Sequence, residues 1–82
     1  MKAVQYSQAA SKALRRHGNM QARILAAVRG YAANPLAHAN NVTPLVGSPF
    51  KRMRVGDYRV IFAETDTAIT VVKIGPRGDV YE

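Results

Sequence analysis

The 82-residue sequence contains no cysteine, which excludes disulfide bonds and thiolate metal sites. It also lacks any apolar run near the ~20 residues that a membrane-spanning helix needs, and its first residues, Met1–Val4, do not begin a signal peptide. These absences predict a cytoplasmic protein with no membrane partner. Because no repeat or low-complexity tract divides the chain, we expect one domain over residues 1–82.

Acidic residues are scarce, since five Asp and Glu accompany twelve Lys and Arg and leave a net charge of +7. So few carboxylates do not supply the converging ligands of a divalent-metal nuclease. The two histidines, His17 and His38, lack metal-site spacing, and no serine has a recognisable His and Asp partner for a hydrolase. We therefore expect neither a metal nor a cofactor.

Arginine supplies most of the positive charge, and the isoelectric point is near 10.4. Because the guanidinium group binds phosphate bidentately and stacks on bases, this bias favours a nucleic-acid partner. An acidic protein partner would satisfy the same charge, and a basic surface kept only for solubility is the remaining alternative.

The first half of the chain has the apolar spacing of helices. Val4–Tyr6 is a candidate opening strand, and Ser7 is a candidate N-cap for a helix over Gln8–Arg16. The segment His17–Asn19 is expected to separate this helix from a second, with its Gly in a left-handed conformation and its Asn as the next N-cap. The second helix should run from Met20 to about Ala33, antiparallel to the first.

The segment from Asn34 to Pro49 contains three prolines, three asparagines and one glycine, which is typical of a surface connection. Its length suggests a functional loop rather than a simple linker. We expect Leu36 and Leu45 to pin it to the core.

The second half alternates in the manner of strands. We expect strands over Lys51–Val55, Tyr58–Ala63 and Ala68–Ile74, with a hairpin turn at Gly56-Asp57 and a short extended tail over Asp79–Glu82. The predicted fold class is therefore α+β, with an N-terminal helical hairpin packed on one face of a small antiparallel β-sheet.

Arginines recur along these strands. Arg52 and Arg54 share a face by the two-residue period, Arg59 returns beside them across the turn, and Arg77 follows the next strand with Tyr81 close behind. Four guanidinium groups would repel one another without an anion between them, and a phosphodiester is a natural anion. The alternative is that each arginine merely faces solvent. The residue pattern alone indicates a basic sheet face that binds nucleic acid.

Three segments resemble the RelE/ParE toxin superfamily. Phe50–Phe62 (FKRMRVGDYRVIF) resembles its strand–turn–strand signature, Val72–Tyr81 its closing strand and tail, and Asn34–Gly47 the loop before the hairpin. The resemblance covers almost the whole chain. It implies a RelE-like fold and a bacterial type II toxin that is neutralised by an antitoxin, itself expected to be acidic and DNA-binding.

The activity that the resemblance implies differs between branches of the superfamily. RelE-type members are metal-independent endoribonucleases that inhibit translation by cleaving mRNA in the ribosomal A site. Their cleavage leaves a 2′,3′-cyclic phosphate. ParE-type members share the fold but poison DNA gyrase. Because fold alone does not decide activity, the first is the favoured interpretation, and a gyrase inhibitor or a basic binding module with weakened catalysis is the alternative.

The resemblance also implies roles for individual residues. Arg59 and Arg77 would stabilise the charge that develops on the phosphate, Arg54 the leaving group, and Tyr81 would act as a base or as a stacking group. Where many relatives carry His or Lys before this arginine, the chain has Pro76. Where many carry a second Arg or another polar residue after it, the chain has Gly78, and both departures favour the gyrase alternative. The expected RNA-binding residues are Arg52, Lys51 and Lys73.

Overall fold

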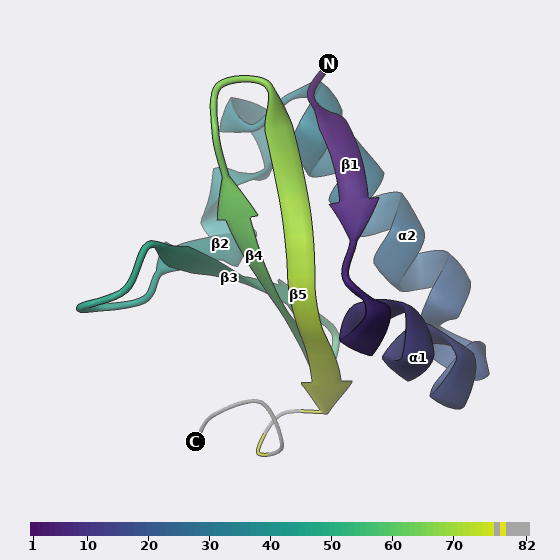
Figure 1. The fold of residues 1–82 in the computed structure, drawn as a ribbon. Coiled ribbons are helices and arrows are strands. Elements are labelled where there is room, and N and C mark those ends of the chain that lie inside the picture. Colours follow the sequence, from purple (N-terminus) through teal and green to yellow (C-terminus); the bar gives the residue numbers. More distant parts are fainter. Residues whose placement is uncertain (77, 79–82) are drawn as a thin grey trace.

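The computed structural model describes residues 1–76 and 78, which form a five-stranded sheet with two helices packed on one face (Figure 1). In chain order the elements are β1 Ala3–Tyr6, α1 Gln8–Arg16, α2 Gly18–Ala33, the 3-10 helix η1 Leu36–Asn41, β2 Val42–Pro44, β3 Phe50–Val55, β4 Tyr58–Glu64 and β5 Ala68–Pro76. The strands lie in the order β1-β5-β4-β3-β2. This architecture confirms the predicted α+β class and the helical hairpin on a small sheet.

The sheet is antiparallel from β2 to β5, but its edge strand β1 runs parallel to β5. Val4 pairs with Ile69 there, so the predicted antiparallel strands from Phe50 onwards are joined by a parallel edge strand whose direction the sequence did not predict. Parallel pairing needs a long crossover, and the helices and the meander between β1 and β5 supply one. The three-residue strand β2 at the other edge was not predicted, because it is too short to show an alternating pattern.

Helix α1 begins and ends where the sequence predicts. The Ser7 hydroxyl accepts a hydrogen bond from the Ala10 amide at 3.0 Å, which confirms the N-cap, and it donates to the Val72 carbonyl of β5 at 3.0 Å. One side chain thus satisfies an unpaired amide at the helix start and attaches the helix to the sheet.

The junction between the helices differs from the prediction. Helix α2 begins at Gly18, which has no positive φ, and Asn19 lies inside the helix instead of capping it. His17 makes the break on its own, with φ −110° and ψ 54°. The left-handed glycine and the asparagine cap were therefore wrong, because a single non-helical residue suffices to redirect the chain.

The connection after α2 is also more ordered than expected. Leu36 is 90% exposed and does not pin the loop to the core, while Leu45 is half-buried. Instead, η1 lies on α2 through Gly30, where a Cβ atom would be 3.3 Å from the ring of His38. A glycine in the helix therefore makes room for the His38 ring and sets the position of η1.

The core lies between the helices and one face of the sheet. Its fully buried large side chains come from α2, β4 and β5, and the ring centroids of Tyr31 and Phe62 are 5.4 Å apart. Truncating a buried aromatic side chain of this kind typically costs about 3–5 kcal/mol. The set comprises Phe62, Ile24, Ile69, Val28, Val60 and Val71.

The β3–β4 hairpin turns at Gly56, which has φ +59° and lies under the guanidinium group of Arg23 from α2. We expect Gly56→Ala to lower the free energy of unfolding by about 1–2 kcal/mol, because a side chain with Cβ is strained at this φ. Urea denaturation measures the change. Gly18→Ala is the matched control, since its site is helical and open, and it should leave stability equal or slightly higher. Equal effects of the two substitutions would contradict the prediction.

Glu64 at the end of β4 joins three parts of the chain. Its carboxylate accepts hydrogen bonds from Tyr31 Oη at 2.7 Å and Lys51 Nζ at 2.8 Å, and it forms an ion pair with Lys2 Nζ at 3.1 Å. Burial opposes ionisation of Glu64, but these partners outweigh it and lower its pKa to about 2. Burial and the bond to Glu64 raise the pKa of Tyr31 to about 12. The cluster therefore ties the N-terminus, α2 and β3 to β4.

Stability should depend on the ionisation of Glu64. Its pKa is about 2 in the folded protein against an ordinary 4.5, so its contribution is complete above pH 4.5 and is lost as pH falls through 2. The shift corresponds to about 3 kcal/mol. Unfolding curves from pH 7 to 2 should show this loss in the wild type and a flatter profile for Glu64→Gln. Asp66→Asn, a change in the exposed β4–β5 turn, is the control and should keep the wild-type profile. If the stability of Glu64→Gln fell with pH as steeply as that of the wild type, Glu64 would not be the group responsible.

Candidate nucleic-acid interface

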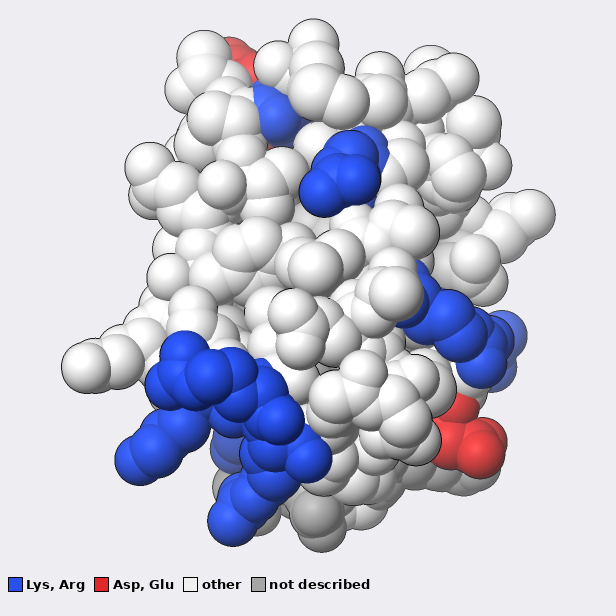
Figure 2. All heavy atoms as spheres, turned by 90° about the vertical axis from the view of Figure 1, so that its right-hand side faces the viewer, with Lys and Arg blue, Asp and Glu red and all other residues white. Residues whose placement is uncertain are grey.

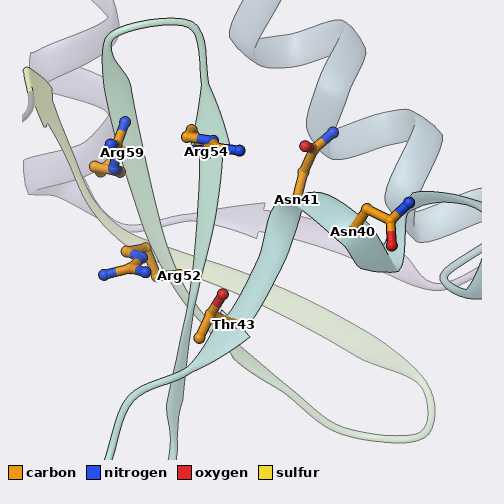
Figure 3. Close-up of a pocket in the computed structure, with 6 residues that line it drawn as sticks. All are labelled: Asn40, Asn41, Thr43, Arg52, Arg54 and Arg59. Carbon is orange, nitrogen blue, oxygen red and sulfur yellow. The ribbon is translucent and has the colours of Figure 1, made fainter.

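A cavity of about 140 Å³ opens on the sheet face that the helices leave uncovered (Figure 3). Its residues come from η1 and β2 on one side and from the β3–β4 hairpin on the other. We call it the arginine pocket, and it is lined by Asn40, Asn41, Thr43, Arg52, Arg54 and Arg59.

Strand alternation explains why the arginines share one face. Met53 and Val55 are buried in the core, so the neighbouring side chains Arg52 and Arg54 point to the opposite side of β3. The hairpin then pairs Arg54 directly with Arg59 of β4. The predicted face shared by these three arginines is confirmed.

Arg59 is the most buried of the three, with an exposed fraction of 8%. Its guanidinium Nη1 donates to the carbonyl oxygens of Tyr58 at 3.1 Å and Gly56 at 3.4 Å. These bonds leave the rest of the guanidinium fork for another acceptor, because the group carries five N–H donors. Arg59 is therefore a donor held in place before any ligand arrives.

Arg54 and Arg59 carry positive charge that no ion pair among the described residues neutralises. Both ion pairs within residues 1–76 involve Glu64, and neither includes Arg54 or Arg59. Among residues 1–76 and 78 no carboxylate lines the pocket, and the chain has no Asp or Glu before Asp57. Like charges directly opposite each other on a sheet are destabilising, so an anion between them would relieve the repulsion.

The other predicted RNA-binding residues lie elsewhere. Lys51 lies on the helix-covered face and is bound to Glu64, so the structure does not bring it into the pocket. Lys73 of β5 lines a separate groove with Lys12 and Arg16 of α1. Arg77 and Tyr81 lie outside the described residues, so their predicted catalytic roles stay predictions.

Sequence reasoning missed the uncharged side of the pocket. Asn40, Asn41 and Thr43 lie in the connection between the helices and the hairpin, and Thr43 is the cross-strand partner of Arg52. The length of that connection suggested function. The Asn-Asn pair within it was the only local signal, and the short strand β2 that brings it to the arginines left no recognisable pattern.

A second basic surface lies away from the arginine pocket. Figure 2 shows Lys and Arg side chains gathered at the lower end of the helical side, where α1 lies in Figure 1. A groove of about 510 Å³ runs between α1 and β5 there, and its charged lining residues are Lys12, Arg16 and Lys73. Helix α1 carries no acid, so nothing on it offsets these charges.

Comparison with known families decides the classification. Residues 4–81 match the family described as the ParE toxin of type II toxin-antitoxin system, parDE. The chain belongs to this toxin family. The match confirms the RelE/ParE superfamily that the hairpin and tail segments indicated, and it identifies the protein as the toxin of a type II toxin–antitoxin system. No curated protein matches this toxin.

Solved structures of related toxins confirm the RelE-like fold. The archaeal RelE–RelB complex from Pyrococcus horikoshii OT3 has 28% identity and a TM-score of 0.76, with 94% of this chain and 96% of that chain covered. The E. coli DinJ–YafQ toxin–antitoxin complex has 19% identity and a TM-score of 0.79, with coverage of 99% and 98%. RelBE2 from Mycobacterium tuberculosis has 24% identity and a TM-score of 0.65, with coverage of 93% and 98%. Within the described part of the toxin, no helix is long and apolar enough to span a membrane.

The repulsion between Arg54 and Arg59 has a measurable consequence. We expect Arg54→Gln to raise the free energy of unfolding at low ionic strength by about 0.2–1 kcal/mol, because it removes a like-charged cross-strand pair. The gain should shrink in about 0.5 M NaCl, where screening is strong. Arg29→Gln, at an exposed position on α2, is the control. Destabilisation by Arg54→Gln at low salt would contradict the prediction.

Proposed function

We propose that this toxin is a ribosome-dependent mRNA endoribonuclease whose arginine pocket holds the scissile phosphodiester. The observation that carries the proposal is the convergence of Arg52, Arg54 and Arg59 on one cavity, whose lining among the described residues includes no carboxylate. Arginine forks fit phosphate oxygens in a bidentate manner, and such a pocket binds one phosphate of an RNA backbone.

The chemistry needs no metal in this proposal. The ribose 2′-OH attacks the adjacent phosphorus, its proton passes to a base, and the 5′-oxygen of the next nucleotide leaves with a proton. The products are a 2′,3′-cyclic phosphate and a 5′-hydroxyl. Arg59 supports the step because backbone carbonyls hold its guanidinium group at the pocket, where its remaining donors would stabilise the charge that builds on the phosphate. One such preorganised donor contributes ~2.7–4 kcal/mol.

Three further residues complete the proposed mechanism. Arg54 lies opposite Arg59 and would stabilise the leaving oxygen, although a guanidinium group is a poor proton donor. Arg77 would supply a second donor to the phosphate, and Tyr81 would serve as the base or stack on a nucleotide. The proposal for Arg77 and Tyr81 rests on the resemblance, since both lie outside the described residues.

We also propose an antitoxin partner that is acidic and binds DNA. The Pyrococcus and E. coli relatives were solved as toxin–antitoxin complexes. In this toxin, residues 1–56 contain no Asp or Glu, and α1 exposes Lys12, Arg15 and Arg16 along one side. An acidic antitoxin segment would neutralise this surface.

The alternative function is inhibition of DNA gyrase. The matched family is described by its ParE toxin, and Pro76 stands where a titratable residue would help proton transfer. In that case the basic surfaces would bind the gyrase–DNA complex rather than mRNA. A supercoiling assay with purified gyrase distinguishes the two functions directly.

Cleavage of mRNA on programmed ribosomes tests the main proposal. We expect wild-type toxin to cleave within the A-site codon, and Arg59→Gln to lower the rate by about 100- to 1,000-fold, because a preorganised donor to the transition state is lost. Primer extension on the recovered mRNA measures both. Arg29→Gln on the exposed side of α2 should cleave at the wild-type rate. Absence of cleavage together with inhibited supercoiling would overturn the proposal in favour of gyrase inhibition.

A further inference from the structure

We propose that the uncharged wall of the arginine pocket, formed by Asn40, Asn41 and Thr43, is a nucleobase subsite that favours adenine. The inference rests on the proposed RNA-binding function and adds a specificity element to it. Nothing in the resemblance or the family match assigns a role to these side chains.

The pocket has two chemically different walls. The β3–β4 hairpin contributes the guanidinium groups, whereas η1 and β2 contribute two carboxamides and a hydroxyl. In Figure 3, Thr43 and Asn41 stand between the arginines and Asn40, which lies farthest from them. A nucleotide whose phosphate contacts the arginines would therefore place its sugar or base against the second wall.

The two asparagine side chains have no structural hydrogen bond to make. Asn34, by contrast, bonds to the start of η1, since its Oδ1 accepts from the amide of Ala37 at 3.4 Å. The side-chain carboxamides of Asn40 and Asn41 form no hydrogen bond within residues 1–76 and 78, and both side chains are exposed. Their donors and acceptors are thus available to a ligand.

The wall is nevertheless held in position. The ring of His38 sits over Gly30 of α2, and the Val42 amide donates to the Ala39 carbonyl where η1 ends. Strand β2 then pairs with β3 and sets Thr43 opposite Arg52. A recognition site built on elements held at both ends keeps its geometry better than one on a free loop.

The chemistry of the wall selects the ligand. Phosphate contacts position a nucleic acid but carry no sequence information, whereas contacts to base edges do. A carboxamide offers one acceptor and two donors, and it pairs bidentately with the N6 and N7 atoms of adenine. A single-stranded base can present this edge, because it does not lie in the deep, narrow major groove of an A-form duplex. We therefore assign base recognition to Asn41, with Asn40 and Thr43 beside it.

The test uses ribosomes programmed with mRNAs that differ by one base in the A-site codon. Wild-type toxin should cleave the adenine-containing codon about 5- to 150-fold faster than the uracil counterpart, which is the range of one good bidentate base contact. Asn41→Ala should lower the rate on adenine to that on uracil while leaving the uracil rate unchanged. Asn40→Ala should narrow the same ratio to a smaller extent.

Two further variants separate specificity from binding and folding. Arg54→Gln should slow cleavage of every codon by the same factor, because it contacts phosphate and not base. Asn19→Ala changes an exposed asparagine of α2 and should keep both rate and preference. Thermal unfolding of each variant confirms that it is folded.

The possible outcomes separate the base subsite from the proposed ribonuclease function. Cleavage by the wild type with an unchanged base preference in Asn41→Ala overturns the subsite alone. Absence of wild-type cleavage on every codon overturns the proposed ribonuclease function and the subsite with it. An equal loss on adenine and uracil codons in Asn41→Ala would show a phosphate or folding contribution and would also overturn base recognition.

Discussion

The constraint on which the site depends is the register of the β3–β4 hairpin. It places the like charges of Arg54 and Arg59 directly opposite each other. This pairing is unfavourable in itself, yet a shift by one residue would turn the buried side chains of one strand, such as Met53 of β3 or Val60 of β4, out of the core. The apolar face of the hairpin therefore holds the charged face together, and the Gly56 turn allows the two strands to keep this register. Burial of apolar side chains on one face of the hairpin thus outweighs the electrostatic repulsion between Arg54 and Arg59 on the other face.

The two faces of the sheet differ in whether a carboxylate lies close to their positive charges. On the helix-covered side, Glu64 binds Lys2, Lys51 and Tyr31, so a carboxylate compensates nearby cations. On the open side, no carboxylate from the part of the chain that the structure describes lines the arginine pocket. The first arrangement stabilises the fold, and the second leaves a site that gains from binding an anion. This division explains how a basic chain can be stable and still present the guanidinium groups of Arg54 and Arg59 to an anion.

The two walls of the pocket are positioned by different interactions. The arginine wall follows from strand alternation, which is local. The asparagine wall depends on η1 resting on Gly30 through His38 and on β2 pairing with β3. The toxin fold seen in RelE and YafQ supplies the frame for both walls, but fold alone assigns neither mRNA cleavage nor gyrase inhibition.

The sequence by itself determined the class of fold, the bounds of α1, the β3–β4 hairpin and the face shared by its arginines, because each depends on periodicity, a cap or a turn within a few residues. It also carried the segments by which the toxin family is recognised. Only the tertiary structure decided that Lys51 is bound to Glu64, that Leu36 is exposed and that β1 runs parallel to β5. It also decided that Asn41 lines the same cavity as the arginines. Those features arise from contacts between segments far apart in the chain, and local patterns do not encode such contacts.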